Sequence, residues 1–306
     1  MMATPPAASF GSDRGANQRK RAEWSMTLPL MAGLAIFAGY PLVYLVLLAF
    51  SRSDLGQQFQ GFVGLENFDW ALSGTNFSGS VGHAILFALI VSLVQLALGL
   101  YLAVILSKIV RGGRWLRTIV LLPLMTPPVM VGIAWKLILN PSGGWLNGIL
   151  LRTGLIDDPI SFFGNHDLAF PAIMLADTWQ WTPLIVNLCF AILQGVPHDV
   201  EEAAALDGAY PKRIFWTVTL PMIAPALLSV YLLRVIMALK TFDLVYTLTF
   251  GGPGNATNIA TFEIWKTALR EFDVGLAAAQ TLMFAITVSV VTLPIVLLHN
   301  HLEKRR

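Results

Sequence analysis

Six long apolar stretches constrain the fold of this chain more than any other feature of its sequence. A helix needs about 20 apolar residues to cross the hydrocarbon core of a bilayer, and each stretch reaches that length. Only helices and closed barrels satisfy their backbone hydrogen bonds in lipid, and a barrel would show short alternating segments instead. The sequence therefore predicts an all-α integral membrane protein with six transmembrane helices. These helices are expected at 27–50, 82–106, 116–139, 168–193, 222–245 and 276–298.

The composition supports lipid as the solvent of this chain. Of its 306 residues, 56% are hydrophobic and only 12% are charged, whereas soluble domains carry about 25% charged residues. The first apolar stretch is too long for a signal-peptide core of roughly 7–15 residues, and no Ala-x-Ala cleavage site follows it, so it is expected to remain as a helix. The single cysteine, Cys189, lies in an apolar run. It allows no intrachain disulfide and is interpreted as a packing residue.

The distribution of basic residues predicts the orientation of the chain. With the N-terminus inside, thirteen of the 20 Lys and Arg residues fall on the inner side, four in outer loops and three within spans. Cytoplasmic segments of membrane proteins carry this excess, so both termini are expected in the cytoplasm at the inner membrane. The predicted organisation is a disordered tail (1–24), a six-helix transmembrane domain (25–300) and a basic tail (301–306). The outer loops are rich in Gly, Asn, Pro and Asp, which is typical of irregular segments.

The segment between the fourth and fifth spans, residues 197–217, carries a helix-turn-helix pattern. Asp199 with Glu202 three positions later fits a helix N-cap and its capping-box partner. Gly208 fits a helix end, and Pro211 fits the first turn of a second helix. Two interpretations are open: a small-sided helix that docks into a cleft of another protein, or an ordinary connecting helix on the membrane surface.

This segment resembles the EAA loop of the inner-membrane permeases of binding-protein-dependent ABC importers. That pattern reads E-A-A, three residues, G, nine residues, I, one residue, L-P. The chain has Glu202-Ala203-Ala204, Gly208, Val218 and Leu220-Pro221 at this spacing, with Val for Ile as the only departure. The resemblance implies that the loop docks into a cleft of a cytoplasmic ATPase. The residues it assigns to coupling are Glu202, Ala203, Ala204, Asp207 and Gly208.

Four further stretches are similar to the carbohydrate branch of that family, which imports maltose, glycerol-3-phosphate or polyols. They are Tyr40-Pro41, residues 62–68, residues 240–243 and residues 248–257. The last two favour the first of the two permease types that such importers pair. The resemblance implies a second homologous permease, a cytoplasmic ATPase dimer, an extracytoplasmic solute-binding protein and a small-molecule substrate. Surrounding lipid is expected as well, and nucleic acid is not.

Polar side chains recur along one face of the fourth span. Asp177, Gln180 and Asn187 lie three to seven residues apart and so share a helix face, with Trp179 and Trp181 nearby. They fit either the lining of a sugar path or hydrogen bonding between helices. Near the outer end of the fifth span, Lys240 and Asp243 are three residues apart and are expected to pair. The residues predicted to line the substrate pathway are Asp177, Trp179, Gln180, Trp181, Asn187, Lys240 and Asp243.

Arg234 lies deeper in the fifth span, where it can face either the pathway or a partner subunit. The sequence contains no G-x-x-x-x-G-K-[ST] pattern for nucleotide phosphates and no His-Glu-x-x-His or Gly-x-Ser-x-Gly. The five histidines have no metal-ligand spacing, so no metal, cofactor or enzymatic activity is predicted. An ion-gradient-driven secondary transporter remains the alternative function, and a membrane-embedded enzyme is a third class without a catalytic cluster to support it.

Overall fold

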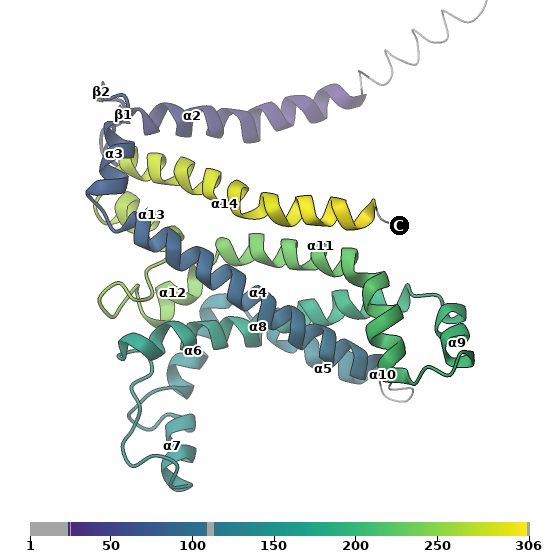
Figure 1. The fold of residues 1–306 in the computed structure, drawn as a ribbon. Coiled ribbons are helices and arrows are strands. Elements are labelled where there is room, and N and C mark those ends of the chain that lie inside the picture. The colour runs from purple at the N-terminus through teal and green to yellow at the C-terminus, as the bar shows by residue number, and fades with distance from the viewer. Residues whose placement is uncertain (1–23, 25, 109–112, 305–306) are drawn as a thin grey trace, which may run out of the picture.

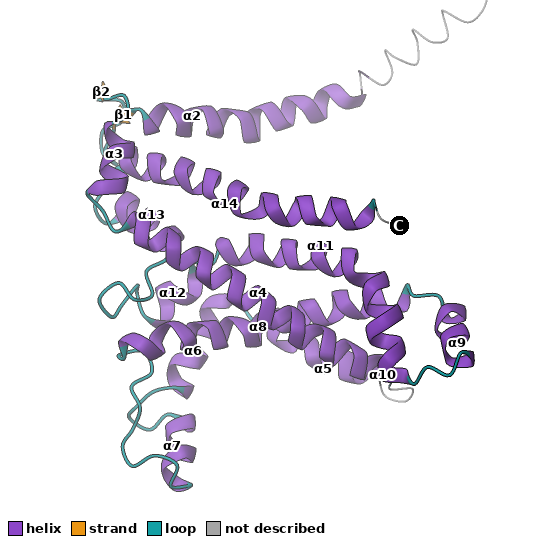
Figure 2. Ribbon diagram, viewed as in Figure 1, coloured by secondary structure: helices purple, strands orange, loops and turns teal. Residues whose placement is uncertain are grey.

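The computed structural model describes residues 24, 26–108 and 113–304. Nearly all of the predicted tail 1–24 lies outside the described residues, and so do the last two residues of the predicted tail 301–306. The described chain is predominantly helical (Figures 1 and 2). Its two strands, β1 (Ser51–Arg52) and β2 (Gly61–Phe62), form one short antiparallel pair.

Four described helices are long and apolar enough to cross a membrane. They are Met26–Ala49, which contains η1 (Ala35–Gly39) and α2 (Tyr40–Ala49); α4 (Phe77–Ser107); Pro211–Leu239, which contains α10 (Pro211–Ile214), η2 (Phe215–Thr219) and α11 (Leu220–Leu239); and α14 (Val274–Glu303). Two bent helix pairs raise the number to six if each pair is one span. One pair is α5 (Gly113–Met125) with α6 (Pro128–Ile138), and the other is α8 (His166–Gln194) with α9 (His198–Leu206).

The third predicted span, 116–139, is not one straight helix. The axes of Thr118–Met125 and Pro128–Ile138 differ by 97°. The break falls at Pro127, whose ψ of 138° is extended. A residue that precedes a proline is pushed out of the α region, because the proline ring collides with its backbone. Pro128 therefore ends the first helix and starts the second.

The fifth predicted span, 222–245, also differs from a single helix. The helix begins earlier than predicted, at Pro211, and ends at Leu239. After Lys240 the chain turns and starts the separate short helix α12 (Asp243–Leu248). The predicted interval therefore spans a helix end, a turn and a new helix start.

The long helices lie side by side, in the order α2, α14, α11 and α4 from the top of Figure 1, with α8 behind α4. The closest pair is α4 and α8: a Cβ placed on Gly99 of α4 would lie 2.6 Å from Ile185 Cγ2 of α8. The main cluster of buried apolar side chains joins α4, α8, α11 and α14. The helix Met26–Ala49 differs from the others, because none of the most apolar part of it is buried within the chain.

The two ends of the bundle carry different segments. One end, at the left of Figure 1, holds α3 (Glu66–Ser73), α12 and α13 (Ala260–Leu269), and α7 (Trp145–Arg152) projects below it. The loops predicted as irregular thus contain short helices. The other end, at the right, holds α9 and α10.

Candidate functional site

The helix α9 begins two residues earlier than the capping-box pattern predicts. Its N-cap position is Pro197, and no side-chain capping bond is present, so the prediction of Asp199 as N-cap with Glu202 as its partner is wrong. Proline has a fixed φ that suits a helix start, which places Asp199 inside the first turn. There, Asp199 and Glu201 lie close to the positive end of the helix dipole.

Gly208 ends α9 in the left-handed conformation, as the sequence predicts, with φ of +82°. The amide of Gly208 donates to the carbonyl of Ala205 at 3.0 Å, and the amide of Ala209 donates to the carbonyl of Ala204 at 3.1 Å. This pair of bonds is a Schellman motif, which satisfies the last carbonyls of a helix and favours glycine. A Cβ at Gly208 would meet no atom within 4 Å, so within this chain only the backbone conformation requires glycine.

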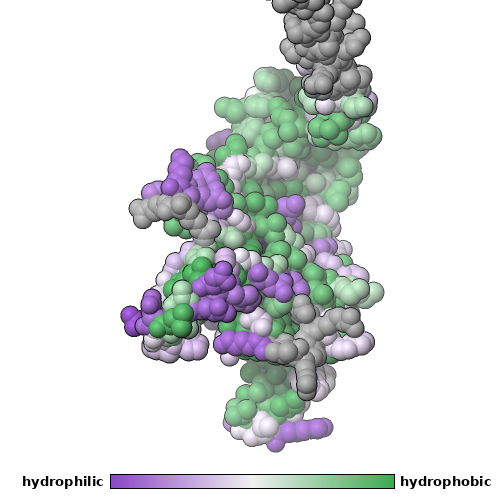
Figure 3. All heavy atoms as spheres, turned by 90° about the vertical axis from the view of Figure 1, so that its right-hand side faces the viewer, coloured by the Kyte–Doolittle hydropathy of each residue, from purple (hydrophilic) through white to green (hydrophobic). Residues whose placement is uncertain are grey.

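The predicted coupling residues form an open surface on α9 and its C-terminal turn. Glu202, Ala203, Asp207 and Gly208 are exposed, and Ala204 is half-buried. The neighbouring Leu206 is 90% exposed, which is unusual for a leucine at the end of a structured helix. Figure 3 looks at this end of the molecule and shows hydrophilic side chains gathered there among the apolar ones. The surface is small-sided, partly apolar and flanked by acidic residues.

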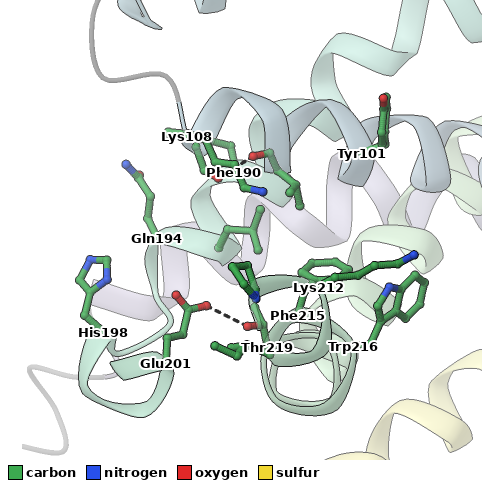
Figure 4. Close-up of a pocket in the computed structure, with 15 residues that line it drawn as sticks. Tyr101, Lys108, Phe190, Gln194, His198, Glu201, Lys212, Phe215, Trp216 and Thr219 are labelled. Atoms are coloured by element: carbon green, nitrogen blue, oxygen red, sulfur yellow. Dashed lines mark hydrogen bonds between the residues drawn. The ribbon is translucent and has the colours of Figure 1, made fainter. Parts of the chain in front are cut away.

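A cavity of about 1080 Å³ separates part of α9 from the long helices (Figure 4). Its walls come from the ends of α4 and α8 and from α9, α10 and η2. A side-chain hydrogen bond on this wall joins α9 to η2: Thr219 Oγ1 donates to Glu201 Oε1 at 2.8 Å. Neither residue belongs to the set predicted from the sequence.

Within the bundle, Asp177 and Arg234 form a buried ion pair. Their side chains are 0% and 1% exposed, and Arg234 Nη2 donates to Asp177 Oδ2. Gln95 of α4 completes the network: it accepts from Arg234 Nε at 2.5 Å and donates to Asp177 Oδ2 at 2.9 Å. The guanidinium also lies 5.5 Å from the ring centre of Trp181. Arg234, for which the sequence left two orientations open, therefore faces the interior of its own chain.

A small cavity of about 100 Å³ lies beside this network, and five of the seven predicted pathway residues line it. They are Asp177, Gln180, Trp181, Lys240 and Asp243. Gln180 Nε2 also donates to the Thr126 carbonyl at 3.2 Å, where α5 gives way to α6. The helix break thus supplies both a free carbonyl and part of the cavity wall, which Pro128 completes.

The other two predicted pathway residues lie elsewhere. Trp179 is 46% exposed and contacts the Trp135 ring, with 6.3 Å between ring centres. Asn187 donates to the carbonyl of Pro183 in its own helix at 2.8 Å. The predicted pairing of Lys240 with Asp243 is also wrong, because among the described residues no ion pair joins them. The turn between α11 and α12 places both side chains at the cavity instead.

Sequence reasoning missed three residues: Gln95, Glu201 and Thr219. A glutamine within an apolar span is a signal that a buried charge nearby needs a partner, and Gln95 is the one glutamine in α4. Thr219 carried no such signal, since threonine is common in apolar helices. Among the described residues, no group of His, Cys, Asp and Glu side chains could hold a metal ion.

The arrangement of long apolar helices with bent pairs and a projecting short helix is that of a multi-pass membrane permease. It matches a chain of a bacterial ABC transporter involved in the import of the acidic polysaccharide alginate, with a TM-score of 0.81, 21% identity, and coverage of 96% of this chain and 99% of that one. A methionine ABC transporter, MetNI, matches with a TM-score of 0.54 and 13% identity over 78% of this chain and 98% of its own.

Sequence comparison defines the family. Residues 95–306 match the family described as "Binding-protein-dependent transport system inner membrane component", and the chain belongs to this family. It is 34% identical over 267 residues to the trehalose/maltose transport system permease protein MalF of Thermococcus litoralis, which covers 86% of this chain and 89% of that protein. It is 28% identical over 270 residues to the sn-glycerol-3-phosphate transport system permease protein UgpA of Agrobacterium fabrum, with 87% and 90% covered. The resemblance that the EAA loop indicated is confirmed.

Proposed function

We propose that this chain is one permease subunit of a sugar-type ABC importer, and that α9 is the helix on which a separate ATPase subunit docks. The observation that carries the proposal is the open surface of α9, where Glu202, Ala203 and Asp207 are exposed in the described part of the chain. Small side chains permit the close approach of another protein, and the flanking carboxylates suit a basic partner. The chain itself has no phosphate-binding glycine loop, so the ATPase is another protein.

The same proposal includes six spans, with both bent pairs crossing the membrane and both termini in the cytoplasm. The basic residues favour this orientation. Reporter fusions after Gly144 and Asn255 are expected to report an external location, and fusions after Gly113 and Asp207 an internal one. One fusion that reports the opposite side would refute the orientation of α9.

The substrate class is a sugar, a polyol or a glycerol-3-phosphate-like solute, taken from a solute-binding protein and passed along a path shared with a second permease. Support comes from the named relatives, which transport trehalose and maltose or glycerol-3-phosphate, and from the chemistry of the small cavity. Lys240, Asp243 and Gln180 offer hydrogen-bond partners for hydroxyl groups, and Trp181 offers a ring on which a sugar can pack. An ion-gradient-driven carrier has less support, because it would have no use for an exposed docking helix.

Reconstitution tests the proposal directly. The chain would be co-expressed with its neighbouring permease, ATPase and binding-protein genes, purified by a tag on this chain, and placed in proteoliposomes. The expected result is co-purification of the ATPase and uptake of a labelled sugar, polyol or glycerol-3-phosphate that requires internal ATP. Uptake driven by an ion gradient without ATP would instead establish the secondary transporter.

A further inference from the structure

The helix α9 projects from the bundle at the ends of two of the long helices. It follows α8 through residues 195–197 and packs against α10 and η2, which lead into α11. Most of its side chains are exposed and none is fully buried, so it has little apolar packing of its own. Any motion imposed on α9 therefore reaches the bundle through its chain connections and through a few specific contacts.

The most specific of these contacts is the hydrogen bond from Thr219 to Glu201. Among the described residues it is the only side-chain hydrogen bond between α9 and the rest of the chain. Thr219 is 3% exposed and Glu201 is half-buried on the wall of the large cavity. A hydrogen bond to a carboxylate is stronger than one between neutral groups, and low exposure reduces competition from water. Figure 4 shows the Glu201 carboxylate directed at the Thr219 hydroxyl.

Thr219 occupies a mechanically sensitive position. It is the last residue of η2, a π-helical segment between α10 and α11. Such segments interrupt the regular hydrogen bonding of a helix and recur at functional sites, because the helix can change register there. Fifteen residues further on, α11 carries Arg234, which is paired with Asp177 of α8. The two contacts join α8, α9 and α11 at two depths: one deep in the bundle and one at the base of α9.

We infer that the Glu201–Thr219 hydrogen bond transmits the movement of α9 to α11, so that Glu201 is a positioning residue for coupling rather than a docking residue. The inference rests on the proposed function. It separates the roles of two adjacent glutamates: Glu202 faces outward to the ATPase, and Glu201 faces inward to the base of α11. With the bond in place, α9 and α11 move together. Without it, α9 follows the ATPase while α11 lags behind.

The test uses the reconstituted importer with four single variants of this chain and the double variant Glu201→Ala with Thr219→Val. Thr219→Val removes the donor with little change of shape, Glu201→Ala removes the acceptor, and Glu201→Gln keeps an oxygen that can accept. Thr217→Val is the matched control, since Thr217 lies in the same π-helical segment and its hydroxyl donates to the Arg213 carbonyl in its own helix. Three quantities are measured for each variant: ATPase co-purification, ATP hydrolysis and solute molecules imported per ATP hydrolysed.

Thr219→Val and Glu201→Ala are expected to retain the ATPase and its hydrolysis but to import roughly tenfold less solute per ATP, the factor that one hydrogen bond to a charged group is worth. The double variant is expected to be no worse than either single one, because both remove the same bond. Thr217→Val is expected to stay within twofold of the parent. Glu201→Gln keeps an acceptor but loses the charge, so its import ratio is expected to lie between that of the parent and that of Glu201→Ala. A normal import ratio for Thr219→Val would overturn the inference and leave the proposed function intact. Failure of the unaltered chain to bind any ATPase would instead refute the proposed function.

Discussion

The buried polar network and the α9 surface contain similar side chains but leave them in opposite states. Asp177, Arg234 and Gln95 bond to one another, and each is at most 1% exposed, although Asp177 Oδ1 has no hydrogen-bond partner among the described residues. Glu202 of α9 and the C-cap residue Asp207 are exposed, and their side chains have no hydrogen-bond or ion-pair partner among the described residues. The first group is paired within its own chain, whereas the second is open to another protein.

This difference suits the two regions to different roles. A buried ion pair is costly to form, because both charges lose their hydration, and it persists only when geometry and added hydrogen bonds compensate. In this chain the pair and Gln95 join α4, α8 and α11. An exposed surface contributes little to stability, so its sequence is free to serve recognition. Substitutions in the buried network should therefore lower the stability of the chain. Substitutions on the α9 surface should leave stability nearly unchanged and affect recognition by another protein.

Removal of one member of the buried pair is expected to have the largest effect. Arg234→Met leaves the Asp177 carboxylate buried without its cation, and Asp177→Leu leaves the guanidinium without its anion. Each change should destabilise the chain by about 3–5 kcal/mol. Thermal unfolding of the purified chain in detergent measures the loss.

The double variant Asp177→Leu with Arg234→Met is the control for this prediction. It removes both charges, so no unpaired ion remains, and it should be more stable than either single variant. If the double variant lost the sum of the two single losses, the pair would not be coupled. The buried network would then not hold the helices together.

Close packing of α4 on α8 is expected to give the next largest effect. Gly99→Ala places a methyl group 2.6 Å from Ile185 Cγ2 and forces the helices apart, at a cost of about 1–3 kcal/mol. Gly82→Ala is the matched control: it lies in the same helix, and its Cβ would meet no atom within 4 Å. That change should leave the unfolding temperature the same or raise it, because alanine favours helix over glycine. Equal losses in the two variants would contradict the close contact.

The end of α9 should respond more weakly. Gly208→Ala puts a side chain on a residue with φ of +82°, which costs about 1 kcal/mol in backbone strain, and Gly208→Val should cost more because valine is branched. Since no atom of the described residues lies within 4 Å of a Cβ at Gly208, the strain is confined to α9, and the bundle should unfold at an unchanged temperature. Hydrogen exchange of the amides in residues 198–209 measures the local loss. Faster exchange throughout the bundle would show that α9 is not an independent unit.

The sequence predicted the long helices better than their interruptions. Prolines alone do not mark a break, since Pro171 and Pro183 lie within the continuous helix α8. The consecutive prolines Pro127 and Pro128 do interrupt the helix, because Pro127, which precedes a proline, must take an extended conformation. The turn after Lys240 has no such local signal and depends on tertiary contacts, such as the Thr261 hydroxyl that donates to the Thr241 carbonyl at 2.5 Å.

The site was predictable to the extent that its residues are local in sequence. The left-handed turn at Gly208 follows from the residue type and its place after a helical pattern. The partners of Asp177 do not follow, because Arg234 and Gln95 are 57 and 82 residues away. The spacing of residues along one helix predicts which of them share a face. Only the packing of the helices determines which residues of other helices contact that face.

Charge reversal on the outer face of α9 should have the smallest effect on the chain and the largest on its function. Glu202 is exposed and has no partner among the described residues, so Glu202→Lys should change the stability of the purified chain by less than about 0.5 kcal/mol. It also reverses the charge that the proposed docking surface offers to a basic partner. The ATPase should therefore bind weakly, or hydrolyse ATP without import.

Glu303→Lys is the control for this charge reversal. Glu303 is exposed near the end of α14, at the same end of the bundle as α9 but outside the α9 surface. Glu303 Oε1 lies 3.5 Å from His299 Nε2, but an exposed pair of this kind contributes little to stability. A lysine there suits the negative end of the helix dipole, so stability and import should both be retained. Unfolding temperature, ATPase co-purification and ATP-dependent uptake are measured for both variants. Normal uptake by Glu202→Lys would mean that the ATPase does not recognise the exposed face of α9. The α9 surface would then differ from the buried network in exposure but would not be a docking surface.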